Sequence, residues 1–379
     1  MHYRVISADN HINEPPGTYV DRVPAHLKDR APRVMRGADG GDGWSFDGKP
    51  PKVTFGLGAT GGVTKQNPRD YKAAGLRWEE ILPGNYDGAA HIKDNELDGV
   101  DAASIYPAAV GGAYALPDRE LALACVRAYN DWLIEDFCAA DPRRLLSLAF
   151  MPVNDGIPTA VAEAERVIAK GAKGLFLPLP DEVGYHDAMY DPLWKLAADA
   201  QVPVTIHRSG VSRKDLGGPP PMEGADPALY VSSIAQGFFR SIPPVSNVIL
   251  TGLFDRFPTL TLIVAEVNCN WVPALAQQMD QEYERQRHWS GLELESAPST
   301  YFGRNVLITM LDDFVGARMA REDPALAAST MFSSDYPHSV TLWPHSQEVI
   351  AELTEGMSED TRHRILAGNA IRAFSLDAS

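Results

Sequence analysis

Cysteine is scarce in this sequence. Its 379 residues include three cysteines, Cys125, Cys138 and Cys269. They are odd in number and form no C-x-x-C pair, which argues against a disulfide framework and against a zinc knuckle. No apolar run approaches the roughly 18 residues that a membrane-spanning helix needs, so we expect no membrane partner. The start lacks the charged and apolar regions of a secretory signal, which predicts a cytoplasmic protein.

Positive charge is also in the minority. The chain has 34 basic and 50 acidic side chains, a formal net charge of −16, and no cluster of lysine and arginine. A surface of this sign repels phosphate backbones, so we expect no nucleic-acid partner. The hydrophobic share of 45% and the charged share of 22% are typical of a globular protein. The partner we expect is therefore a small-molecule substrate.

Short apolar stretches alternate with helical patterns along most of the chain. Eight stretches predict β-strands, at residues 3–7, 101–106, 144–150, 174–178, 203–207, 259–266, 305–309 and 330–335. Helical spacing between them predicts helices, among them a long one over about 228–254. Eight strand-helix pairs favour parallel units that close into a (β/α)8 TIM barrel. A doubly wound open sheet is the alternative, but the first strand lacks the glycine-rich phosphate turn typical of that fold.

Two segments rich in glycine and proline interrupt this alternation, at about 36–90 and 208–224. Runs such as Gly-Gly-Asp-Gly at 40–43 are not expected to form regular elements. Long loops of this kind are usually lids, binding loops or oligomer contacts. Both follow strand ends, so we expect them to cover the carboxyl-end face of a single domain over residues 1–379. We also expect this barrel to form a homo-oligomer.

Polar side chains able to bind a metal stand at several of the predicted strand ends. Asp9 and His11 follow the first strand, His207 ends the fifth, Glu266 ends the sixth and Asp335 ends the eighth. Residues two apart in a strand point the same way, and in a barrel the carboxyl ends form one ring. Two histidines and several carboxylates in one ring repel and dehydrate one another unless a cation or protons lie among them. The ring therefore predicts a site for a divalent metal ion.

Several motifs bear on the family of the chain. They are the D-x-H-x-x-E of Asp9, His11 and Glu14, the Val-Thr-Ile-His of 204–207, the Phe-Ser-Ser-Asp-Tyr-Pro-His of 332–338, and the Ile-Leu-Ala-Gly-Asn-Ala of 365–370. With these the chain resembles the amidohydrolase superfamily over nearly its whole length. The resemblance is to the branch that includes aminocarboxymuconate semialdehyde decarboxylase and γ-resorcylate decarboxylase.

The resemblance implies roles for individual residues. Asp9 and His11 match the ligand pair of the first strand, His207 matches the histidine of the fifth, and Asp335 matches the aspartate of the eighth. Relatives commonly carry a histidine on the sixth strand, where this chain has Glu266. We treat Glu266 as a candidate for both metal binding and catalysis. Asp335 is a candidate ligand or general base, as the resemblance to hydrolytic members implies.

Further candidates lie close to these positions in the sequence. His338 follows the eighth-strand aspartate by three residues and is a candidate catalytic group, or else a loop histidine bonded to backbone. Arg208 adjoins the fifth-strand histidine and can hold a substrate carboxylate in a fork, although a salt bridge on the barrel rim is the structural alternative. Glu14, Tyr106 and Trp271 are the remaining candidates for substrate contacts, with packing as the alternative for the two aromatic residues.

Several kinds of chemistry fit such a ring. A bound Zn, Mn or Fe ion lowers the pKa of its water and polarises a carbonyl or carboxylate. Hydrolysis of an amide or ester and non-oxidative decarboxylation of a small organic acid therefore both remain open. The extra carboxylate of Glu266 also allows a second metal, and so a dinuclear non-haem iron monooxygenase that hydroxylates an organic substrate. The non-enzymatic alternative is a catalytically inactive barrel that binds a ligand.

Overall fold

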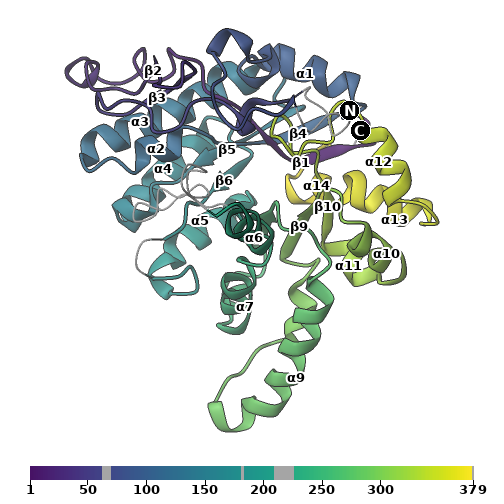
Figure 1. The fold of residues 1–379 in the computed structure, drawn as a ribbon. Coiled ribbons are helices and arrows are strands. Elements are labelled where there is room, and N and C mark those ends of the chain that lie inside the picture. Colours follow the sequence, from purple (N-terminus) through teal and green to yellow (C-terminus); the bar gives the residue numbers. More distant parts are fainter. Residues whose placement is uncertain (62–69, 181–182, 209–225, 378–379) are drawn as a thin grey trace.

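The computed structural model describes residues 1–61, 70–180, 183–208 and 226–377. At its centre lies a nearly closed barrel of eight parallel strands (Figure 1), in the order β1-β4-β5-β6-β7-β8-β9-β10. These strands are β1 Ile6–His11, β4 Ala102–Tyr106, β5 Leu145–Phe150, β6 Gly174–Phe176, β7 Val204–His207, β8 Leu262–Ala265, β9 Val306–Met310 and β10 Thr330–Phe332. The predicted (β/α)8 barrel is confirmed.

Helices surround the strands and bury their apolar faces against them (Figure 1). They are α1 Gly88–Leu97, α2 Val110–Tyr114, α3 Arg119–Trp132, α4 Ile157–Ala169, α5 Asp191–Ala200, α6 Pro227–Gly237, α7 Ile242–Leu250, α8 Leu253–Arg256, α9 Val272–Ser290, α10 Phe314–Glu322, α11 Pro324–Ser329, α12 Ser346–Leu353, α13 Glu359–His363 and α14 Asn369–Ala373. Helix α9 extends away from the barrel (Figure 1). Within the described ranges, no helix is both long enough and apolar enough to cross a membrane.

The first strand lies later in the chain than its apolar pattern predicts. The prediction placed it at residues 3–7, whereas β1 runs over Ile6–His11 and all of its side chains are buried. Its pairing with β4 shifts register between Ser7 and Asn10, the kind of irregularity that often re-aims side chains beside functional sites. Two of its polar residues, Ser7 and Asn10, can be buried because their side chains form hydrogen bonds.

The long helix predicted over 228–254 is three helices, α6, α7 and α8. A proline occupies the first turn of α7, where a missing N–H is tolerated but a continuous helix is not favoured. Gly252, between α7 and α8, has a φ of 70°, in the left-handed region that favours glycine. The prediction of one continuous helix was therefore wrong, although most of its residues are helical.

The first glycine-rich segment contains more regular structure than predicted. Strands β2 Arg33–Arg36 and β3 Asp42–Ser45 form an antiparallel hairpin, so the prediction that 40–43 is irregular was wrong for residues 42 and 43, whereas 40 and 41 lie in the connection between the strands. Gly43 is required there because a Cβ would lie 2.5 Å from the Val53 carbonyl oxygen. The second predicted insertion, 208–224, lies outside the described residues apart from its first, Arg208.

Candidate metal centre

Strand β1 brings two candidate ligands into the carboxyl end of the barrel. The Asp9 side chain is fully buried, and that of His11 nearly so. The His11 Nε2 lies 3.2 Å from the Asp9 Oδ1 and also 3.2 Å from the Asp335 Oδ1. The first and eighth strands of the barrel therefore contribute side chains to one cluster, as predicted from their sequence positions.

The segment after β10 supplies the other side of this cluster. Asp335 is buried and has a φ of 54°, a conformation that is rare for non-glycine residues and is often found at functional sites. The His338 Nδ1 lies 3.3 Å from the Asp335 Oδ1. The His338 ring stacks on the His11 ring, with a centroid distance of 3.7 Å. His338 thus lies at the cluster rather than on an outer loop.

Strands β7 and β8 bring His207, Arg208 and Glu266 to the same end. The His207 Nε2 lies 3.7 Å from the Asp9 Oδ2 and 3.4 Å from the Glu266 Oε2. The Arg208 Nη2 donates to the Glu266 Oε1 at 2.5 Å. The Arg208 guanidinium also lies over the Phe238 ring, 4.6 Å from its centroid. Glu266 therefore connects the cluster to a positive charge at its edge.

The donor atoms of this cluster fit a metal ion. Asp9, His11 and His207 each offer an atom within 4.8 Å of the others, and so do His11, Asp335 and His338. Both carboxylate oxygens of Asp9 and of Asp335 are buried without a hydrogen bond to any described residue. Buried carboxylates are costly unless they are hydrogen-bonded, paired with a positive charge or bound to a metal, so these atoms are suited to hold a cation.

The pKa shifts within the cluster also favour a bound cation. Burial lowers the pKa of the His11 imidazole, but the carboxylates of Asp335 and Asp9 outweigh this effect and raise it to about 10. For Asp9, burial raises the pKa, yet the imidazoles of His207 and His11 bring it below its ordinary value. For Asp335, burial likewise raises the pKa, but the imidazoles of His338 and His11 bring it below its ordinary value, so both aspartates are held as carboxylates. Their negative charge favours a cation between them, either a proton on His11 or a metal ion.

Comparison of the sequence with known protein families identifies the family of this chain. The sequence pattern of the amidohydrolase family matches residues 79–376. The chain belongs to the amidohydrolase family. The matched part includes His207, Glu266 and Asp335, whereas Asp9 and His11 precede it. The predicted resemblance is confirmed.

The chain is similar to several named proteins in sequence or in fold. The chain is 28% identical over 218 residues to the decarboxylase orsB of Emericella nidulans, a match that covers 55% of this chain and 62% of the relative. It thus spans less than two thirds of that relative. An amidohydrolase of Mycobacterium avium subsp. paratuberculosis has a similar structure, with a TM-score of 0.76 at 22% identity, covering 100% of this chain and 99% of that one.

Another similar structure is a dihydroxybenzoic acid decarboxylase of Polaromonas, solved with bound manganese and the inhibitor 2-nitroresorcinol. Its TM-score is 0.65 at 18% identity, covering 99% of this chain and 98% of that one. At such identities the two structural matches establish the barrel fold.

Three other residues were predicted to contact the substrate, and all three are buried. Tyr106 is buried beside it, with its ring centroid 5.6 Å from that of His11 and 5.3 Å from that of His207. Glu14 is buried and accepts hydrogen bonds from the backbone N–H groups of Ala109 and Val110. Trp271 is buried in the core, where its Nε1 donates to the Val267 carbonyl.

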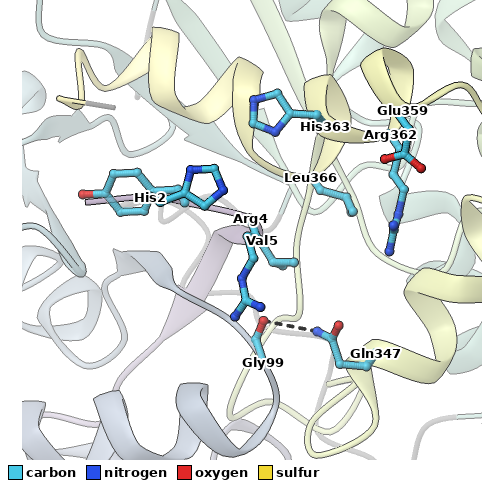
Figure 2. Close-up of a pocket in the computed structure, with 10 residues that line it drawn as sticks. His2, Arg4, Val5, Gly99, Gln347, Glu359, Arg362, His363 and Leu366 are labelled. Atoms are coloured by element: carbon cyan, nitrogen blue, oxygen red, sulfur yellow. Dashed lines mark hydrogen bonds between the residues drawn. The ribbon is translucent and has the colours of Figure 1, made fainter. Parts of the chain in front are cut away.

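A cavity of about 470 Å³ lies at the opposite end of the barrel (Figure 2). Residues His2 to Val5, before β1, and Gly99, before β4, line it together with α13. Figure 2 shows His2, Arg4, Arg362 and His363 around it. These four side chains are exposed, and none of the predicted site residues lines the cavity.

Two buried polar residues next to the candidate ligands were not predicted from the sequence. Asn10 lies between Asp9 and His11, and Ser334 precedes Asp335. Both are buried and hydrogen-bonded to each other, with 2.8 Å between the Ser334 Oγ and the Asn10 Oδ1. The signal that could have revealed them is the run of polar residues in a stretch that must be buried if its neighbours bind a metal.

Proposed function

We propose that the protein is a metal-dependent carboxy-lyase that removes carbon dioxide from a small aromatic acid without oxidation. The single observation that carries this proposal is the cluster of two aspartates and three histidines, all buried except the partly exposed His338, at the carboxyl end of an amidohydrolase-family barrel. The name of the Emericella nidulans relative supports decarboxylation. The manganese and the resorcinol inhibitor in the Polaromonas structure support the metal and the aromatic class.

In this proposal Asp9, His11, His207 and Asp335 hold the metal, and Glu266 is a further candidate ligand. The metal supplies positive charge that polarises the oxygen atoms of the substrate. Manganese is the proposed ion because carboxylate and imidazole donors suit it and because the Polaromonas enzyme binds it. Zinc and iron also suit this donor set.

The remaining roles follow from what decarboxylation requires. The bond between the ring carbon and the carboxyl group breaks, its electron pair stays on the ring carbon, and that carbon must then gain a proton. We propose that Asp335 and His338, 3.3 Å apart, handle this proton, with Glu266 as the alternative donor. Arg208 and Tyr106 are the proposed substrate contacts. Arg208 provides positive charge at the edge of the cluster, and Tyr106 an aromatic face beside it.

The test is to load purified protein with Mn²⁺ and to offer hydroxybenzoic acids under nitrogen, measuring released CO2 and the loss of substrate absorbance. Asp335→Asn is expected to abolish release while keeping the side-chain shape. The matched control is Asp199→Asn, because Asp199 is an exposed aspartate paired with Lys195 and lies outside the cluster. Intact release of CO2 by Asp335→Asn would contradict the proposed roles.

A second candidate function is a dinuclear iron monooxygenase, which the two overlapping donor groups sharing His11 favour. Glu266 adds a third carboxylate where relatives commonly carry a histidine, and carboxylates bridge metal pairs well. Hydroxylation would consume O2 with two electrons and two protons from a reductant, placing one oxygen atom in the product and one in water. About two iron ions per chain with substrate-dependent O2 uptake would favour it. CO2 release under nitrogen would exclude it as the main reaction.

We further propose that residues 1–379 form one domain and that the first insertion helps to roof the pocket. Its Leu57 carbonyl accepts from the Ser339 N–H, and the Gly61 N–H donates to the Pro337 carbonyl, next to His338. Replacing 57–61 by a glycine-serine linker is expected to raise KM. The homo-oligomer, the cytoplasmic location and the roofing role of 208–224 remain proposals, and light scattering tests the first.

A further inference from the structure

The barrel closes along a seam between its first and last strands, β1 and β10. Among the described residues no strand ladder joins these two, although every other neighbouring pair has one. Three backbone N–H groups donate across the seam instead, besides hydrogen bonds between side chains: the Asp335 N–H donates to the Asp9 carbonyl at 2.9 Å, the His11 N–H to the Tyr336 carbonyl at 2.7 Å, and the Ser334 N–H to the Ser7 Oγ at 2.9 Å. The seam therefore runs through the candidate metal ligands.

One side-chain amide lies at the middle of this seam. The Asn10 Oδ1 lies 2.6 Å from the Ser7 Oγ and 2.8 Å from the Ser334 Oγ. Its Nδ2 lies 3.0 Å from the His91 Nε2 and 3.2 Å from the Asn95 Oδ1. Asn10 is fully buried, so these four contacts replace all the hydrogen bonds it would make with water. The amide thus connects β1, the end of β10 and helix α1.

The directions of these hydrogen bonds can be deduced from a single carbonyl. The His91 Nδ1 lies 2.8 Å from the Gly84 carbonyl oxygen, which can only accept, so Nδ1 carries the proton. In the neutral ring Nε2 is then an acceptor, and Asn10 must donate to it through Nδ2. The Asn10 Oδ1 therefore faces Ser7 and Ser334, whose hydroxyls donate. The orientation of the amide is set by its surroundings and has no equivalent alternative.

We propose that Asn10 is a positioning residue for the metal centre, acting with Ser334, Ser7 and His91. Its amide fixes the separation between the β1 ligands, on either side of it, and Asp335, which follows Ser334. The inference rests on the metal centre of the proposed function. Hydrogen-bonding partners that orient ligands without touching the metal commonly affect affinity, and their loss weakens binding by about 10- to 100-fold.

The experiment measures the Kd for Mn²⁺ by electron paramagnetic resonance of the free ion, in full-length protein whose fold is checked by circular dichroism. Asn10→Ala is expected to weaken Mn²⁺ binding by about 10-fold or more. Ser334→Ala, which removes one of the two hydroxyl donors, is expected to weaken it by a smaller factor, and Ser334→Thr to restore it because the hydroxyl returns.

The matched control is Asn130→Ala. Asn130 is likewise fully buried, and its amide accepts from the N–H of Phe150, the last residue of β5, at 2.7 Å and donates to the Glu163 carboxylate at 2.8 Å. Its loss is expected to lower the melting temperature without changing the Kd for Mn²⁺. If Asn10 had a purely structural role, Asn10→Ala would also lower the melting temperature and leave the Kd for Mn²⁺ unchanged. A weakened Kd therefore distinguishes a positioning role from a structural one.

Each outcome decides the inference. Wild-type affinity in folded Asn10→Ala would overturn it, and so would an equal loss of affinity in Asn130→Ala. If Asn10→Ala does not fold, Ser334→Ala decides: weakened binding that Ser334→Thr restores supports the inference, and unchanged binding overturns it. If the wild-type protein binds no Mn²⁺, both the proposed metal centre and this inference are wrong. Wild-type protein that binds Mn²⁺ but releases no CO2 would overturn the proposed function alone.

Discussion

The ion pair between Glu266 and Arg208 allows a quantitative prediction. Glu266→Gln keeps the shape of the side chain but removes its charge, leaving the Arg208 guanidinium without its carboxylate. The side-chain exposures are 6% for Glu266 and 16% for Arg208, and their atoms lie 2.5 Å apart. Removing one partner of a buried pair costs about 3–5 kcal/mol, and the remaining exposure of Arg208 favours the lower end, about 3 kcal/mol.

This energy can be converted into a melting temperature. An unfolding entropy of about 2.1 cal/mol/K per residue gives roughly 0.8 kcal/mol/K for 379 residues, so about 3 kcal/mol lowers the melting temperature by about 4 °C. Calorimetry in the presence of a chelator measures the ion pair without metal. Repeating it with Mn²⁺ shows whether the loss grows, as it should if Glu266 is also a ligand.

The controls separate this pair from ordinary surface charge. Glu282→Gln removes a carboxylate that also lies close to an arginine, with 2.8 Å between the atoms of Glu282 and Arg285, but these side chains are 42% and 62% exposed. Exposed pairs contribute about 0–1 kcal/mol, so its melting temperature should change by about 1 °C or less. Equal melting of Glu266→Gln and the wild type would refute the reasoning. So would strict additivity of Glu266→Gln with Arg208→Met.

Three further predictions concern the site and its supports. Asp335→Asn should weaken Mn²⁺ binding by more than about tenfold, measured as metal content after gel filtration, because it replaces a buried carboxylate with a neutral amide. Glu14→Gln should cost about 2 kcal/mol in urea unfolding and leave KM unchanged, because the Glu14 carboxylate accepts from two backbone N–H groups and an amide satisfies only one. Burial lowers the pKa of His91 to about 4, so folding favours the neutral ring; this stability is present above about pH 6.5 and should fall by about 3 kcal/mol as the pH drops from about 6.5 to about 4. His91→Gln should lack that part of the pH dependence, and an unchanged profile would contradict the assignment.

The barrel was predictable because its strands are short apolar stretches at regular intervals, and the strand ends then placed His207, Glu266 and Asp335 together. The first strand was misplaced because β1 is polar, and local hydrophobicity does not report side chains that are satisfied by partners distant in the sequence. Asn10 is the clearest case, since Ser334 lies at the other end of the chain.

Other features could not be predicted from the sequence for related reasons. The β2–β3 hairpin depends on Gly43, where the approach of another backbone segment makes a glycine necessary; sequence alone marks the same glycine as a sign of a loop. For Trp271 both a pocket position and core packing were open, and the sequence does not choose between them; its side chain is buried within the core. Which way a side chain turns after a strand depends on the local backbone, as the left-handed conformations of Glu266 and Asn268 illustrate.

The seam also has a consequence for how the protein folds. Ser7 and Ser334, which meet there, are separated by 327 positions along the chain, so closing the ring is the most non-local step in forming the barrel. The candidate metal site spans this closure, and an unfinished barrel would lack it. A metal that binds only the closed ring stabilises it by about 2.7 kcal/mol at a free concentration 100 times its Kd. Bound metal would then stabilise only chains that have completed the barrel. Chains that end before β10 should gain no stability from the metal, even if their other strands have formed.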